Sequence, residues 1–130
     1  MQTFTTAATL FTLIATGVMA SPAPFGGDGT FYSPGNDACS KSGHSSTASD
    51  LIAALNVEQF GGHYNGDTDQ SPSCYKCAQV KGPKGSVKVQ IVDLCPECKQ
   101  GDLDLSPSAF KAIADPVAGR VPISWTWTSC

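Results

Sequence analysis

Six cysteines constrain the fold of this chain more than any other feature of its sequence. They stand at positions 39, 74, 77, 95, 98 and 130. Two pairs, 74–77 and 95–98, have the Cys-x-x-Cys spacing that is typical of a zinc ribbon. The count is even, however, two cysteines lie outside that pattern, and neither pair contains the glycine common in metal knuckles. We therefore predict disulfides, and the residues alone leave every pairing of the six open.

The amino terminus has the composition of a secretory signal peptide. Residues 7–19 are apolar and rich in threonine, and small residues flank a cleavage point before Ser21. The stretch is too short and too polar to span a bilayer of about 30 Å. We expect residues 1–20 to be removed, residues 21–28 to form a flexible lead-in, and residues 29–130 to fold as one secreted, extracellular domain. Oxidising conditions outside the cell also favour disulfides.

The charge balance limits the partners. The chain has 8 basic and 11 acidic residues, a net charge of −3, which argues against binding to nucleic acid. No further apolar run of spanning length follows the leader, so we expect no membrane partner. The sequence contains no glycine-rich nucleotide fingerprint and indicates no cofactor or metal. Nothing in it demands more than a monomer.

Short strands and two short helices are indicated along the mature chain. Strands are predicted at 29–32, 77–80, 86–94 and 121–128, with a hairpin turn at 82–85 joining the second to the third. One helix is predicted at 49–55, where Leu51, Ile52 and Leu55 share a face. The other begins at Ser106–Pro107 and ends at Asp115. This order predicts a mainly β fold, a small barrel with Trp125 and Trp127 in its core.

Two acidic residues, one at the end of an apolar run and one after a turn rich in Cys and Gly, are the candidates for chemistry. Asp93 ends the strand 86–94, and Asp104 lies just before the second helix. We expect the two carboxylates to meet at the lip of a groove. An Asp beside a turn often only binds loop backbone, so a purely structural role is the alternative.

The chain resembles the expansin and rare-lipoprotein-A-like superfamily, whose members share a six-stranded double-psi β-barrel. The resemblance runs from Gly29 to Cys130. The chain is similar above all to the fungal single-domain, loosenin-like group. It rests on four segments, Gly29–Tyr32, Val92–Leu94, Asp102–Phe110 and Ile123–Trp125. The barwin proteins share the barrel, and their resemblance implies the pairs Cys39–Cys74 and Cys77–Cys130, with Cys95–Cys98 as the remaining bridge.

The resemblance also implies a function. In expansins the positions matching Thr30, Asp93 and Asp104 line a polysaccharide groove, and we add Tyr32 as an aromatic candidate beside them. In family-45 glycoside hydrolases, which share the barrel, the catalytic acid matches Asp104, but the base matches Pro34, which cannot activate water. We therefore expect a non-hydrolytic protein that binds and loosens cellulose, chitin or a related glucan. Bacterial expansins have tyrosine where this chain has Cys95, so one of their sugar contacts is missing.

Two other classes of function stay open. Some small double-psi barrels resemble inhibitors of papain-type proteases, and others act as secreted effectors. A secreted protease is therefore the alternative partner, and the loop at 61–73 would contact it. A redox enzyme using the Cys95–Cys98 pair is a third class, although no thioredoxin-like βαβ pattern surrounds the pair.

We expect the fold to survive a metal chelator and to lose stability in strong reductant. A disulfide that closes a loop of a few tens of residues contributes about 3–4 kcal/mol in the chain-entropy model. Thermal unfolding followed by circular dichroism, with chelator or with reductant, checks this expectation. Unfolding by chelator alone would instead support the zinc ribbon.

Overall fold

The computed structural model describes residues 3, 23–40, 43, 45–61 and 67–130. The leader predicted at 1–20 therefore lies, except for residue 3, outside the described residues, as does part of the loop predicted at 61–73. No helix in the part of the chain that the structure describes has both the length and the apolar character needed to cross a membrane.

Six strands close into a barrel, as the resemblance implied. They are β1 (Phe25–Phe31), β2 (Ile52–Asn56), β3 (Cys77–Lys81), β4 (Ser86–Cys95), β5 (Leu103–Leu105) and β6 (Val121–Thr128). Their order around the barrel is β1-β5-β2-β4-β3-β6. The pairs β1–β5 and β2–β4 are parallel, and the remaining pairs are antiparallel. The fold is mainly β, and the prediction of a double-psi β-barrel is confirmed.

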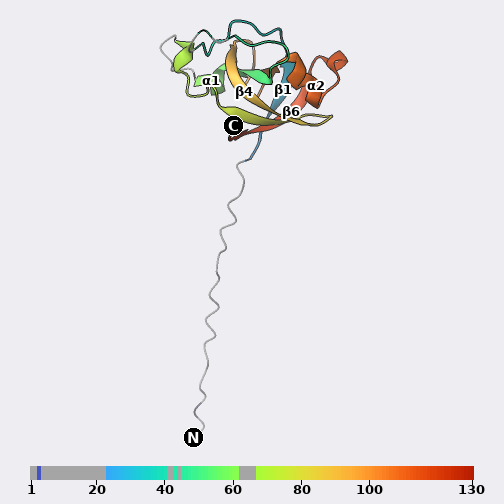
Figure 1. The fold of residues 1–130 in the computed structure, drawn as a ribbon. Coiled ribbons are helices and arrows are strands. Elements are labelled where there is room, and N and C mark those ends of the chain that lie inside the picture. The colour runs from blue at the N-terminus through green and yellow to red at the C-terminus, as the bar shows by residue number, and fades with distance from the viewer. Residues whose placement is uncertain (1–2, 4–22, 41–42, 44, 62–66) are drawn as a thin grey trace.

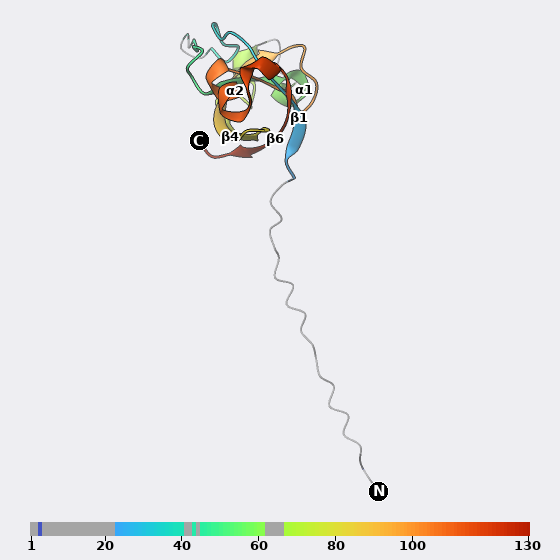
Figure 2. The same ribbon diagram turned by 90° about the vertical axis from the view of Figure 1, so that its right-hand side faces the viewer.

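Two short helices complete the fold, α1 (Val57–Gly61) and α2 (Pro107–Ile113). In Figures 1 and 2 both lie on the upper side of the barrel, while β6 and the carboxyl terminus lie on the lower side. The predicted start of α2 is confirmed, because Ser106 caps it by accepting a hydrogen bond from the N–H of Ala109 and Pro107 occupies the first turn. Single turns of 3₁₀ helix stand at Thr68–Gln70 and Pro116–Ala118.

The helix predicted at 49–55 is wrong, because residues Ile52–Asn56 form strand β2. All five residues of β2 are buried. The strand lies between β4 and β5, with the side chains of Ala53 and Leu55 in the barrel core. A strand covered on both faces shows no alternation of polar and apolar residues, so its pattern cannot be told from a buried helix. The helix in this region is α1, which follows β2 directly.

The lead-in predicted at 21–28 also needs correction, because β1 begins at Phe25 rather than Gly29. Residues 25–29 pair with β6 in antiparallel register, from Phe25 opposite Trp125 to Gly29 opposite Val121. The glycines of this segment weaken the strand pattern in the sequence, so the strand was predicted to begin too late. One of them, Gly27, lies where an added Cβ would come within 2.4 Å of the backbone of Gly101, so the glycine allows the close approach of two segments.

The core is a single cluster inside the barrel, and it includes Trp125 as predicted. Trp125 is 1% exposed, and its indole N–H donates to the carbonyl oxygen of Gly101 at 2.9 Å. Trp127 is half-buried and meets the Trp125 ring edge-on, with ring centroids 5.1 Å apart. The indole bond ties the loop between β4 and β5 to the core.

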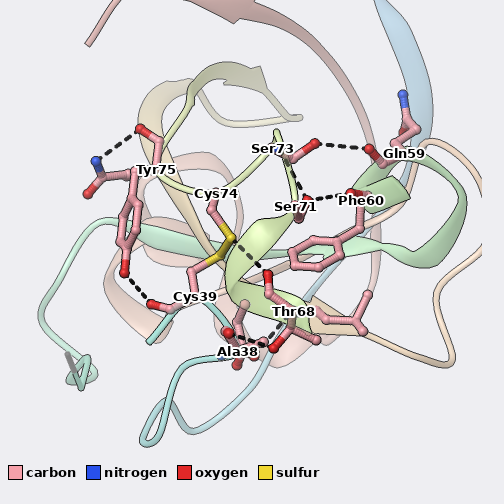
Figure 3. Close-up of a disulfide and its surroundings, with 12 residues drawn as sticks. Ala38, Cys39, Gln59, Phe60, Thr68, Ser71, Ser73, Cys74 and Tyr75 are labelled. Carbon is pink, nitrogen blue, oxygen red and sulfur yellow. Dashed lines mark hydrogen bonds between the residues drawn. A yellow bond between two sulfur atoms is a disulfide. The ribbon is translucent and has the colours of Figure 1, made fainter. Parts of the chain in front are cut away.

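All six cysteines form disulfides in the pairing that the resemblance implied, Cys39–Cys74, Cys77–Cys130 and Cys95–Cys98. Figure 3 shows the first bridge, which fastens the loop after β1 to the segment before β3. Beside it Tyr75 adopts a left-handed backbone conformation with φ of 66°. Its N–H donates to the carbonyl oxygen of Ile91 at 2.7 Å, and its hydroxyl donates to the carbonyl of Cys39. These hydrogen bonds stabilise a backbone conformation that few residues other than glycine adopt readily.

Asn56 at the end of β2 joins three parts of the chain. It is fully buried, and its amide nitrogen donates to the side-chain oxygen of Gln59 at 2.6 Å and to the carbonyl of Asp102 at 3.1 Å. Its amide oxygen accepts the N–H of Gln59 at 3.0 Å. Gln59 in turn accepts the N–H of Gly101 at 3.0 Å. The loop between β4 and β5 is thus hydrogen-bonded to β2 and α1.

We expect Asn56→Ala to lower the free energy of unfolding by about 2–3 kcal/mol, because it leaves buried backbone groups without partners. Thermal unfolding would show a decrease in Tm of roughly 10 °C for a domain of this size. The exposed Gln79 provides a matched control, since Gln79→Ala should change stability by less than about 0.5 kcal/mol. Equal Tm values for the two variants would contradict a structural role for Asn56.

Candidate functional site

Four side chains form a row on the side of the strands that faces away from the barrel core; Ala54 is buried there, and Thr30, Asp93 and Asp104 are half-buried. Thr30 of β1 lies opposite Asp104 of β5, Asp104 lies opposite Ala54 of β2, and Ala54 lies opposite Asp93 of β4. The row therefore crosses four neighbouring strands. Neighbouring strands lie about 4.8 Å apart, which puts the two carboxylate-bearing backbones about 10 Å from each other. The structure brings Thr30, Asp93 and Asp104 together as predicted, and it adds Ala54 between them.

Two hollows lie along this row and share three residues, so they form one groove. The smaller hollow has a volume of about 260 Å³ and is lined by Tyr32, Ala54, Asp93, Leu94, Cys95, Pro96, Glu97 and Asp104. The larger has a volume of about 410 Å³ and is lined by Asp28, Thr30, Cys95, Glu97, Cys98, Lys99, Asp102, Asp104 and Arg120. Asp104 lies where the two meet. Tyr32 lines the smaller hollow only.

Asp104 is half-buried and has a modified acidity. Its Oδ1 accepts the hydroxyl of Thr30 at 2.8 Å. Burial raises the pKa of Asp104 above the ordinary value for aspartate, and the nearby carboxylates of Asp93 and Glu97 raise it further. The Thr30 hydrogen bond and the charge of Arg120 act in the opposite direction without cancelling the rise. Asp104 therefore keeps its proton to a higher pH than an exposed aspartate does.

Asp93 differs from Asp104 in that its oxygens are already occupied. Oδ1 accepts the backbone N–H groups of Ala38 at 3.0 Å and Leu94 at 2.9 Å, and Oδ2 accepts the hydroxyl of Tyr32 at 3.1 Å. Burial and the Asp93 carboxylate raise the pKa of Tyr32, so its phenol stays protonated and donates. Asp93 thus fixes the Tyr32 ring at the end of the groove.

Charged residues that were not among the predicted site residues line the other end of the groove. Arg120 forms an ion pair with Asp28 at 3.1 Å. The carboxylate of Asp102 accepts the N–H of Asp28 at 2.8 Å and that of Lys99 at 3.0 Å, so it stabilises the loop between β4 and β5. Asp102 begins one of the segments on which the resemblance rests, but the place of these residues in the groove was not predicted, because three separate segments supply them. Pro34 lines neither hollow.

Glu97 is the one remaining carboxylate of the groove. It is exposed, it lies inside the turn that the Cys95–Cys98 disulfide closes, and it borders both hollows. Among the described residues it is the groove carboxylate with neither a hydrogen bond nor an ion pair. The described residues contain no group of three or more His, Cys, Asp or Glu side chains that could hold a metal ion.

Comparison with known proteins now gives this barrel its family. A family model described as lytic transglycolase matches residues 53–125, more than half of the 130-residue chain. The chain belongs to this family of double-psi β-barrels, and its resemblance to the expansin and rare-lipoprotein-A-like superfamily is confirmed. Expansin-YoaJ of Bacillus subtilis is 47% identical over 47 residues, which is 36% of this chain and 20% of that protein.

Two solved structures extend the comparison to the whole barrel. A variant of the Clavibacter michiganensis expansin, in complex with cellohexaose, is 32% identical with a TM-score of 0.67, over 81% of this chain and 50% of that one. The Streptomyces papain inhibitor is 26% identical with a TM-score of 0.70, over 82% of this chain and 97% of that one. The chain thus spans only half of the expansin, and between 19% and 55% of the curated relatives it matches.

We expect Asp104→Asn to unfold at a higher temperature than the wild type at neutral pH. Because folding raises the pKa of Asp104, the ionised carboxyl destabilises the folded state above that pKa, and the amide removes this effect. The difference should disappear as the pH falls below about 4, where the carboxyl is protonated in both states. Calorimetry across this range checks the prediction. Glu58→Gln, at an exposed site, is the control of equal charge; lower stability of Asp104→Asn at neutral pH would contradict it.

Proposed function

We propose that this protein is an expansin-like protein that binds cell-wall polysaccharide in the groove and loosens it without hydrolysis. The observation that carries the proposal is the row of Thr30, Asp104, Ala54 and Asp93 along one open groove. The expansin of similar fold was solved with cellohexaose, a soluble glucan, which supports a glucan as ligand. The proposal includes secretion, which the signal-like leader supports. It also includes membership of the loosenin-like subtype.

The groove offers hydrogen-bond partners of both kinds to a sugar chain. A protonated Asp104 donates to a sugar oxygen, and an ionised one accepts from a sugar hydroxyl. Ala54, with its small side chain, leaves room between the two carboxylates for the chain to lie close to the barrel. Tyr32, held by Asp93, adds an aromatic side chain at one end. Such contacts compete with the hydrogen bonds that hold one glucan chain to another, so chains separate while no covalent bond breaks.

The same residues argue against hydrolysis. Glycoside hydrolysis ordinarily needs a carboxylate that activates water besides the acid. The position that matches the hydrolase base is Pro34, the oxygens of Asp93 are occupied, and Asp28 and Asp102 are paired. Glu97 is left as the one carboxylate that could take that role, and it stands on an exposed turn where water screens it. Glu97 therefore provides the sharpest test of the proposal.

We expect wild-type protein to disperse cellulose or chitin fibres without releasing reducing sugar. Asp104→Asn should lower the affinity for the insoluble polymer about tenfold, the effect of losing one hydrogen bond to a charged group. Ala54→Leu should lower binding as well because it fills the groove, whereas Ala54→Ser is the matched variant that keeps the space. Circular dichroism verifies the fold of each variant. Sugar release that depends on Asp104 and is abolished by Glu97→Gln would establish a hydrolase instead.

Inhibition of a papain-type protease is the second candidate function. The nearly complete coverage of the Streptomyces papain inhibitor supports it. The contact loop expected at 61–73 includes residues 62–66, which are outside the described residues. Assaying the same variants against papain separates the two functions. Inhibition that Asp104→Asn and Ala54→Leu leave unchanged, together with no binding to polysaccharide, would favour the inhibitor.

A further inference from the structure

The lysines of this acidic protein are unevenly distributed. Residues 70–92 contain four of the eight basic residues and no acidic residue. The four are Lys76, Lys81, Lys84 and Lys88, and all are exposed. They belong to β3, β4 and the segments adjoining them. In Figure 1 the β3–β4 hairpin, drawn in yellow, runs beside β6 on the lower side of the barrel.

The strand register puts two of these lysines on one surface. Lys88 lies opposite Gln79, and Lys81 lies opposite Ser86, so both lysines share the outer side of the β3–β4 pair. The intervening Val80 and Val87 are buried in the core. On the other side of β3, Thr126 and Ser124 of β6 lie opposite Gln79 and Lys81. We call this surface the basic face; its residues are Gln79, Lys81, Ser86, Lys88, Ser124 and Thr126.

Lysines extend the positive charge beyond both ends of β3. Lys76 precedes the strand and lies over the ring of Trp127, 5.4 Å from its centroid, and Lys84 occupies the hairpin turn. A hollow of about 470 Å³ at the hairpin end is lined by Lys81, Gly82, Pro83, Pro122, Ile123 and Ser124. The positive charges are therefore spread along a line on a surface with room for a ligand at one end.

No carboxylate of the described residues neutralises this charge. The ion pair found among them joins Arg120 to Asp28, on the groove side. In the barrel order the two middle strands of the groove, β5 and β2, lie on the side away from β3 and β6, while β4 carries Asp93 of the groove at one end and Lys88 near the other. Like charges on one surface repel one another, so a face of lysines in a protein with net negative charge is stabilised when an anionic ligand covers it.

We propose that the basic face binds a polyanionic polysaccharide, a polymer that carries carboxylates at intervals along an extended chain. Lysines supply point charges for carboxylates, and the hydroxyl and amide groups of Gln79, Ser124 and Thr126 supply hydrogen bonds for sugar hydroxyls. None of the six residues of the basic face is aromatic, and the neighbouring Trp127 ring lies under Lys76, so the face offers no row of rings on which the bases of single-stranded nucleic acid could stack. It has no apolar side chain to enter a lipid surface. This second site goes beyond the proposed groove function and does not depend on it.

Retention on immobilised polygalacturonate tests the basic face. We expect wild-type protein to be retained at low salt and released at high salt, because exposed charges are screened. Lys88→Gln should weaken binding about two- to fivefold, and Lys81→Gln/Lys88→Gln should weaken it further, since one exposed ion pair accounts for a change of that size. Lys88→Arg should retain binding. Methyl-esterified polymer, which carries no charge, should not retain the protein.

Lys111→Gln is the matched control, because Lys111 is exposed on α2, where it borders a different hollow from the one that Lys81 lines, and the change in net charge is the same. An equal loss of retention in Lys111→Gln and Lys88→Gln would overturn the proposal, since net charge alone would then explain binding. If immobilised duplex DNA or anionic vesicles retained the protein as strongly as polygalacturonate does, with the same dependence on Lys88, the proposal would also be overturned. Asp104→Asn should bind polyuronide like the wild type, which separates this site from the groove.

Discussion

Strand β2 is the element on which the rest of the structure depends. It pairs in parallel with β4 and in antiparallel with β5, and it is buried along its whole length. This double pairing places β4, which carries Asp93, and β5, which carries Asp104, on either side of Ala54. At its end, Asn56 holds the loop that carries Glu97 and Lys99. One five-residue strand thus sets both the floor of the groove and the position of its border.

Hydrogen bonding and burial together give the two groove aspartates different roles. Asp93 accepts three hydrogen bonds from groups of the protein itself and orders Tyr32 and the loop after β1. Asp104 accepts one, from Thr30, and faces the groove with its ionised form disfavoured. A carboxyl that is held in an unfavourable environment lowers stability, and such strain is common at functional sites. Asp104, rather than Asp93, is therefore the residue whose chemistry a ligand would meet.

The sequence predicted those parts of the structure whose signals are local. The hairpin of β3 and β4, the cap of α2 and the strand β6 follow from alternation and turn residues, and they are confirmed. The disulfide pairing and Thr30 followed from the resemblance rather than from the residues themselves. β2 was missed because burial on both faces removes alternation, although its short length favours a strand. Ala54, Glu97 and Arg120 could not be predicted, because only closure of the barrel brings their segments to one groove.

Closure of the barrel also separates the charges of the molecule. The carboxylates of Asp93, Asp104 and Glu97 border the groove, whereas Lys81 lies on β3, across the barrel from β5, and Lys88 lies near the opposite end of β4 from Asp93. A neutral glucan in the groove and an acidic polymer on the basic face would then contact the protein at the same time without repelling each other. Two weak sites on one rigid body bind more firmly than either alone, provided that the geometry lets both be occupied. Under both proposals the two surfaces belong to one barrel, so the condition is met where the glucan and the acidic polymer are parts of the same wall.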